Sequence, residues 1–272
     1  MSEQCLQAFR YSVLCLFKRV SSYSFNEYVK KFNPEDGRIK LKIDHISRVT
    51  NYSKQIASNL NLNEEQIRLA ELIGIFHDIG RFKQAEKYNT FSDKESGINH
   101  AEYSINVLYE DNLIEKFKVD SKYNHIIKKA VLNHNKSAIE TGLSEEELLF
   151  AKIIRDADKL DIITHVITEY DFESVFWYPE FNCTEINEQL IKTMFETHTL
   201  DYSKIKNNAD QILSFYNMIF DLNFKASLQE LLNNKALNKF TDRIYENFDS
   251  EKVKEQTKKV FEYTQKYLNE NA

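Results

Sequence analysis

Glycine and proline are scarce in this chain, which has five glycines and two prolines in 272 residues. β-Sandwiches and barrels need many tight turns, and glycine and proline supply the backbone angles of those turns. Long stretches rich in Leu, Ile, Lys, Glu and Gln instead favour helices joined by polar loops. The sequence therefore predicts an all-α fold.

The balance of residue types narrows the class of protein. Hydrophobic residues make up 42% and charged residues 29%, which is typical of a globular chain and not of a disordered one. The net charge is −6, so the basic excess that a phosphate backbone attracts is missing, and we expect no stable binding of long nucleic acid. A small anionic substrate stays compatible with this charge, because a metal ion can supply positive charge locally.

The cysteines and the apolar runs bear on location. Cys5, Cys15 and Cys183 are odd in number and match no zinc or redox spacing, which indicates small apolar residues in a reduced compartment. No apolar run reaches the roughly 18 residues of a membrane helix. The apolar stretch 13–17 lacks a basic leader and a cleavage site, so we do not interpret it as a signal peptide. We expect a cytoplasmic protein that contacts no membrane.

Apolar spacing and capping residues divide the chain into helices. In the first part, Asp44, Asn63 and Asn99 are predicted N-caps, and Ser144 with Glu147 suggests a capping box. Segments 88–98 and 169–184 are predicted to be irregular, the second being rich in aromatic residues. The predicted helices cover residues 4–20, 44–59, 64–80, 100–109, 121–138, 144–168, 185–196, 205–222, 225–233 and 236–268, the last with a break near 249–250.

The chemistry is concentrated in one part of the chain, where five of the seven histidines fall between His45 and His134. One of them is followed by an acid at the apolar end of a predicted helix, in Phe76-His77-Asp78-Ile79-Gly80. A buried ionised carboxylate needs a charged partner or a metal. Imidazole nitrogen and carboxylate oxygen are both good ligands for divalent ions.

Helical spacing places a metal-type ligand at the end of four separate apolar stripes. A single such histidine is more often a core residue with a satisfied hydrogen bond, but four stripes ending this way indicate a metal site. The stripes are His45 with Val49, Tyr52 and Ile56; Ala70, Ile73 and His77; Ile127, Ala130, Val131 and His134; and Phe150, Ile154 and Asp158.

The order of these residues resembles the signature of the HD superfamily of metal-dependent phosphohydrolases. Four motifs carry the resemblance, over about residues 40–165: His77-Asp78-Ile79-Gly80-Arg81, Asn99-His100-Ala101-Glu102, Asn133-His134-Asn135 and Asp156-Ala157-Asp158-Lys159-Leu160-Asp161. The resemblance implies an HD-domain helical bundle with additional C-terminal helices. We therefore predict an N-terminal helical extension (1–39), an HD-type domain (40–168) and a C-terminal helical extension packed on it (169–272).

The resemblance also implies the metal ligands His45, His77, Asp78, His100, His134 and Asp158. His100 and His134 would hold a second ion, with Asp78 bridging to a first ion on the remaining residues. In the alternative interpretation, His100 and His134 bind the substrate phosphate and only one ion is present. The mixture of histidine and carboxylate favours Mn, Fe, Co, Ni or Zn over Ca or Mg.

The activity implied by the resemblance is metal-dependent hydrolysis of a phosphate ester, with a nucleotide or another small molecule as substrate. Asp78, Arg81 and Lys159 are the predicted catalytic residues, the last two as phosphate contacts unless they are ordinary solvated charges. Lys83, Asn135 and Lys136 are weaker candidates for the same contact. No Gly-Tyr-Pro motif follows His134, so hydrolysis of cyclic di-GMP is not expected.

Two other functions remain open on the same fold. One is a non-catalytic, metal-binding signalling or interaction module, and the other is oxygen-dependent chemistry at a di-iron site. The first is disfavoured because no ligand of the first site is missing. Alarmone hydrolysis by a short chain stays open, and a homodimer is compatible with the sequence but has no support in it.

Overall fold

The computed structural model describes residues 23–272, and over this range it contains helices and no strand. The prediction of an all-α fold is confirmed. The chain divides into two compact units, one ending at Ile154 and the other beginning at Arg155. Helix α8, Glu145–Asp161, continues through this division. The packing of a C-terminal extension on the domain before it stays a prediction, and the predicted helix 4–20 lies outside the described residues.

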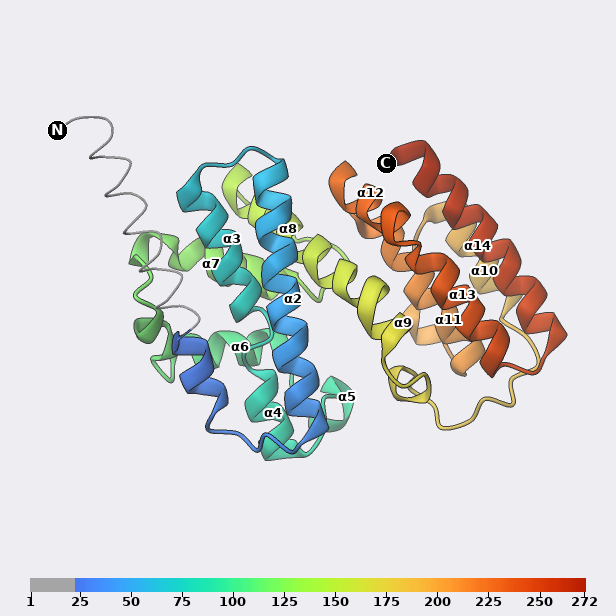
Figure 1. The fold of residues 1–272 in the computed structure, drawn as a ribbon, viewed down its shortest axis with the longest axis horizontal. Coiled ribbons are helices and arrows are strands. Elements are labelled where there is room, and N and C mark those ends of the chain that lie inside the picture. The colour runs from blue at the N-terminus through green and yellow to red at the C-terminus, as the bar shows by residue number, and fades with distance from the viewer. Residues whose placement is uncertain (1–22) are drawn as a thin grey trace. The chain divides into compact units, whose positions relative to one another are not determined.

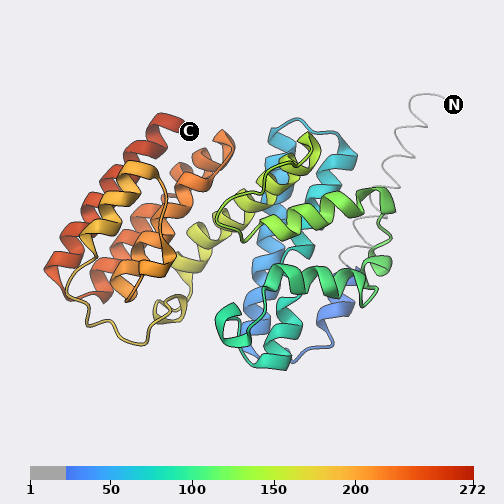
Figure 2. The same ribbon diagram turned by 180° about the vertical axis from the view of Figure 1, so that it is seen from behind.

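The first unit contains helices α2 to α7 (Figure 1), and the chain from His45 to His134 runs through it. Helix α2 packs along α3, α4 packs against α6, and α6 and α7 lie side by side, as the view from behind also shows (Figure 2). Residues 23–29 are helical and precede α2. The helices of this unit before α8 are α2 (Gly37–Asn59), α3 (Glu64–Phe76), α4 (Arg81–Tyr88), α5 (Asp93–Ser96), α6 (His100–Tyr109) and α7 (Asn124–Asn133), with 3-10 turns at Leu113–Phe117 and Ser121–Tyr123.

Side-chain caps account for most of the helix starts. Asn63 forms a reciprocal capping box with Gln66, and the predicted cap at Asn99 is confirmed by its bonds to the first turn of α6. The predicted box of Ser144 and Glu147 is confirmed by hydrogen bonds in both directions.

The prediction that Asp44 caps α2 is wrong. The helix begins at Gly37, where Asp36 accepts from the Arg38 backbone at 2.9 Å and also pairs with the Arg38 guanidinium. Asp36 and Asp44 are both of a residue type that caps helices, and the helix begins after Asp36 because the turn ends there. Segment 88–98 also differs from its prediction as a loop, because Ser92 caps the short helix α5 within it.

The core of the first unit is aromatic and aliphatic. Phe76 meets Phe117 edge-on at a centroid distance of 4.8 Å, and Phe82 packs against Tyr28 and Phe32. Burying one such side chain stabilises the fold by about 1.5–3 kcal/mol. This core surrounds the end of α3, where the His77-Asp78 pair lies.

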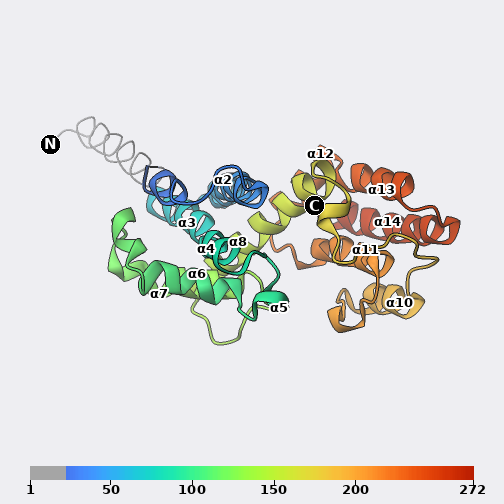
Figure 3. The same ribbon diagram turned by 90° about the horizontal axis from the view of Figure 1, so that it is seen from below.

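The second unit is a separate helical bundle in which α14 packs against α11, α12 and α13 (Figure 3). Phe172 and Phe176 from the aromatic segment pack around Phe248, which supports a core role for this segment within the unit. The predicted break near 249–250 is confirmed, because Ser250 caps α14. Beyond the end of α8, the elements are a π-helical turn (Ile162–Val166), α9 (Ile167–Glu169), α10 (Glu188–Thr197), α11 (Asn208–Asn217), α12 (Lys225–Asn234), α13 (Ala236–Asn247) and α14 (Glu251–Asn271), with 3-10 turns at Glu173–Val175, Tyr202–Lys204 and Met218–Asp221.

Among the described residues, no helix combines the length and the apolar character that crossing a bilayer requires.

Candidate metal centre

The His77-Asp78 pair lies where α3 ends. The helix stops at Phe76, and the His77 backbone N–H closes its last turn on the Ile73 carbonyl. A short turn then leads to α4, which begins at Arg81. The chain therefore leaves α3 four residues earlier than predicted. Both His77 and Asp78 are buried.

Two glycines allow the neighbouring helices to approach this turn. A Cβ atom on Gly74 would lie 2.8 Å from the Thr50 Cα of α2, and one on Gly80 would lie 2.6 Å from the Ser104 backbone nitrogen of α6. Neither neighbour is a flexible side-chain end, so both positions require glycine for close approach. Gly80 N also donates to Ser104 Oγ at 3.0 Å. The glycines thus bring α2 and α6, with their histidines, close to Asp78.

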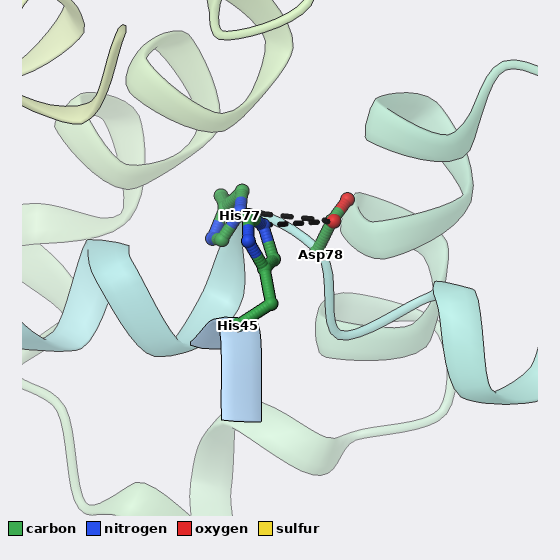
Figure 4. A group of neighbouring side chains, drawn as sticks. All are labelled: His45, His77 and Asp78. Carbon is green, nitrogen blue, oxygen red and sulfur yellow. Dashed lines mark hydrogen bonds and ion pairs between the residues drawn. The ribbon is translucent and has the colours of Figure 1, made fainter. Parts of the chain in front are cut away.

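The first cluster joins α2 to this turn (Figure 4). His45 Nε2 lies 3.2 Å from His77 Nε2, and the two nitrogens lie 3.6 and 3.7 Å from Asp78 Oδ2. The carboxylate points toward the two imidazole rings (Figure 4). These three ligand atoms lie within 4.8 Å of one another, close enough to share one ion.

The second cluster lies on the other oxygen of the same carboxylate. His100 Nε2 and His134 Nε2 are 3.1 Å apart, and each lies 3.8 Å from Asp78 Oδ1. His100 begins α6, and His134 is the C-cap of α7. Asp78 therefore offers one oxygen to each histidine pair.

Hydrogen bonds on the far side of the rings set their tautomers. His77 Nδ1 lies 2.7 Å from the Gly74 carbonyl, and His134 Nδ1 lies 2.6 Å from the Val131 carbonyl. A carbonyl oxygen can only accept, so Nδ1 carries the proton and Nε2 keeps a lone pair. His100 Nδ1 lies 2.6 Å from the Asp93 carboxylate, which assigns the same tautomer.

This arrangement fits a cation. When both rings are neutral with the proton on Nδ1, the lone pairs of His100 Nε2 and His134 Nε2 face each other at 3.1 Å, and a cation between them would remove their repulsion. The buried Asp78 Oδ1 beside them has no hydrogen-bond donor. Imidazole nitrogen and carboxylate oxygen together suit a divalent transition metal.

The charges around Asp78 keep it ionised. Burial raises the pKa of this carboxyl, but electrostatic interactions with Lys42, His77, Arg81 and His100, led by Lys42, outweigh burial and hold its pKa well below the usual range. Lys42 Nζ lies 2.5 Å from Asp78 Oδ2. Lys42 lies one helical turn before His45 on α2, and this spacing is the signal in the sequence that relates it to the centre.

Asp93 is the second residue that the sequence analysis did not identify. Its carboxylate accepts from Arg81 Nη1 at 3.0 Å and from His100 Nδ1. Burial raises its pKa, but the His100 and Arg81 interactions lower it to about 2. Burial lowers the pKa of His100, against the opposing bond to Asp93, and favours the neutral ring that a metal ligand needs. No spacing rule relates Asp93, which lies in a segment predicted to be irregular, to His100.

Arg81 is the predicted phosphate contact of this unit. Its Nε lies 3.5 Å from Asp78 Oδ1 and has no hydrogen-bond partner, whereas Nη1 is shared by Asp93, Gln84 and the Phe91 carbonyl. The guanidinium is thus held beside the second cluster, and its role toward phosphate stays a prediction.

A hydrogen bond between two asparagine side chains connects the start of α6 to the residues after α7. Asn99 Oδ1 caps α6 by accepting from the Ala101 and Glu102 backbones. The same oxygen accepts from Asn135 Nδ2 at 3.1 Å, directly after His134. Asn135 thereby helps to hold the two helices that carry the second cluster.

Asp158 and Lys159 lie on the part of α8 that belongs to the second unit. In that unit, Lys159 Nζ pairs with Asp221 at 2.8 Å, and Asp221 also pairs with Arg155. Burial and the nearby Arg155 lower the pKa of Lys159, with Asp221 opposing them. Both proposed roles, Asp158 as metal ligand and Lys159 as phosphate contact, stay predictions.

The weaker candidates already have ionic partners. Lys83 pairs with Asp111 at 2.6 Å, and Lys136 pairs with Glu140 at 2.6 Å. His125, which the helical spacing places away from His134, is exposed and pairs with Glu147.

Comparison with protein families matches residues 43–163 to the HD domain. This stretch contains the turn and all five clustered ligands. This match shows that residues 43–163 are similar to an HD domain, in agreement with the resemblance to metal-dependent phosphohydrolases. Neither the curated proteins nor the solved structures contain a match to the chain.

Proposed function

We propose that the HD domain hydrolyses a phosphate ester of a nucleotide or another small molecule, with divalent transition metal ions on the two clusters that share Asp78. The observation that carries the proposal is the pair of lone-pair-bearing nitrogens, His100 Nε2 and His134 Nε2, beside the donor-free Asp78 Oδ1. Divalent ions at such a centre lower the pKa of water and neutralise phosphate charge, as hydrolysis requires.

The chain's own residues supply orientation and charge. Asp78 is ionised and presents both oxygens, and the backbone carbonyls behind His77 and His134 fix which nitrogen faces the centre. Arg81 is our proposed phosphate contact, since its guanidinium can donate to two oxygens in a fork. Its Nε is free to do so without breaking an existing hydrogen bond.

The substrate is proposed to be small, because the net charge of −6 disfavours a long polyanion. A cytoplasmic location is part of the proposal and is supported by the cysteine pattern, with Cys183 unpaired in the described part of the chain.

The test is phosphate release from a panel of nucleotides and small phosphate esters with added Mn, Co, Ni or Mg. We expect metal-dependent turnover by the native chain and at least a 100-fold loss in Asp78→Ala, a larger effect than the roughly 10–100-fold typical of residues behind a ligand. Metal content should fall in parallel, because Asp78 serves both clusters.

The matched control is Asp111→Asn, which removes a carboxylate paired with Lys83 on the same unit without touching the clusters. It should retain turnover and metal. Metal-loaded native protein that releases no phosphate from any substrate would contradict the proposal. Oxygen consumption by an iron-loaded sample would then favour di-iron chemistry, and its absence would favour a metal-binding interaction module.

A further inference from the structure

The Asp93 carboxylate contacts both His100 and Arg81 beside the second cluster. Its Oδ2 accepts from the His100 backbone at 3.2 Å and from His100 Nδ1 at 2.6 Å. Its Oδ1 accepts from Arg81 Nη1 at 3.0 Å and from Gln84 Nε2 at 3.2 Å. Both oxygens are therefore used, and they connect a candidate ligand to the candidate phosphate contact.

The histidines are oriented in two different ways. His77 and His134 each donate to a carbonyl three residues earlier in their own segment, so local backbone geometry fixes them. His100 begins α6 and has no preceding helical turn whose carbonyl could play this part. Its ring is oriented by a side chain from a separate short helix, α5.

We infer that Asp93 is the positioning residue of the second cluster, and that it makes His100 a metal ligand by fixing the Nδ1–H tautomer and the direction of Nε2. A carboxylate behind a ligating imidazole orients the ring and raises its basicity. The same carboxylate holds Arg81 next to the cluster, so one residue sets both the second ligand and the phosphate contact. This inference rests on the metal centre of the proposed function but not on its substrate.

Asparagine at position 93 would not replace the aspartate. Its amide has one acceptor oxygen, whereas four donors converge on the two oxygens of Asp93. It also lacks the negative charge that stabilises the Nδ1–H side of the ring. Asp93→Asn should therefore weaken the second cluster and leave the first cluster of His45, His77 and Asp78 intact.

The experiment measures manganese binding to native protein, Asp93→Asn and Asp93→Glu, by equilibrium titration and by electron paramagnetic resonance. We expect two ions in the native protein, with the magnetic coupling of a bridged pair. In Asp93→Asn, the second ion should bind about 10–100-fold more weakly and the coupled signal should be lost. Asp93→Glu should restore part of the affinity, because it keeps the carboxylate.

Two further variants separate positioning from general damage. Glu95→Gln changes an exposed carboxylate of the same short helix that bonds Thr90, and it should bind both ions as the native protein does. In a His100→Ala background, Asp93→Asn should cause no further loss, because its effect passes through His100. Circular dichroism of the metal-free variants checks that they are folded.

Native second-site affinity in folded Asp93→Asn would overturn the inference, as would native protein that binds only one ion, or a full additional loss in the His100→Ala background. Failure of the proposed function has a different signature. If the two-ion behaviour follows these expectations but no phosphate ester is hydrolysed, the positioning role stands and the hydrolase proposal fails.

Discussion

The two histidine pairs on Asp78 are similar in composition but differ in how they are built. His45 and His77 are almost fully buried and belong to α2 and α3, which pack along each other. His134 is also buried, but the His100 side chain is 12% exposed and depends on Asp93. The first pair is thus part of the helix-packing core, and the second is assembled at its edge.

Because of this difference, binding of the second metal ion can change without a change in the stability of the fold. Moving the first pair means moving packed helices, which costs core contacts. The second pair can lose its geometry through changes in the short helix α5 and its cap, Ser92, without unpacking α2 from α3. Binding of a second ion should therefore be the more adjustable property.

We expect the largest effects from replacing the glycine beside each histidine pair by alanine. Gly74→Ala pushes α2 from α3, and Gly80→Ala pushes α6 from the turn, in both cases against backbone atoms. Each should destabilise the metal-free protein by about 1–3 kcal/mol. Gly74→Ala should lower affinity at the first cluster and Gly80→Ala at the second, as measured by urea unfolding and manganese titration.

Gly37→Ala is the control for this comparison, because a Cβ there meets nothing within 4 Å and the site begins a helix. It should be neutral or stabilising, by up to about 1 kcal/mol. Equal effects of Gly74→Ala and Gly80→Ala on both clusters would mean that the pairs are not separately built.

A smaller effect on metal affinity is expected from replacing Lys42. Its ammonium group pairs with Asp78 Oδ2, the oxygen that faces His45 and His77. A cation at Asp78 Oδ2 competes with a metal ion there, so Lys42→Met should raise metal affinity at the first cluster about tenfold, or 1.4 kcal/mol. The second cluster, on Oδ1, should change less. Isothermal titration with manganese measures both.

Lys30→Met provides the matched control, since Lys30 is exposed and pairs only with Glu27 among the described residues. It should leave both affinities unchanged. A loss of affinity in Lys42→Met would show that Lys42 supports metal binding instead of competing with it.

The smallest effect is the loss of stability of the metal-free protein at low pH. The pKa of Asp93 is about 2, below its ordinary 3.8, so ionised Asp93 stabilises the metal-free protein above about pH 4, and this contribution is lost as the pH falls toward 2. A shift of this size corresponds to at most about 2.5 kcal/mol. Since the side chain is 34% exposed, we expect about 1 kcal/mol.

The measurement is urea unfolding of metal-free native protein and Asp93→Asn from pH 6 to pH 3. The difference in unfolding free energy should shrink as the pH falls. A difference that stays constant over this range would mean that the Asp93 carboxylate has no depressed pKa in the folded protein.

Local pattern predicted much of the helical framework. Asn63, Asn99 and the Ser144 box cap helices as expected, because each bond lies within one turn of chain. The cap of α2 was mispredicted, since Asp36 and Asp44 are locally equivalent candidates. The end of α3 was placed too late because its apolar spacing continues into the turn that carries Asp78.

The sequence by itself determined the helical class and, through the His-Asp pair and its apolar stripes, the residue types of a metal centre. It indicated His134 through an apolar stripe as well as through the resemblance, and His100 through the resemblance alone. Tertiary structure alone decided that each pair faces a different oxygen of Asp78, that Lys42 pairs with one of these oxygens, and that Asp93 belongs to the centre. Those contacts join segments far apart in the chain, so they depend on how closely α2 and α6 approach the turn, which helical periodicity does not encode.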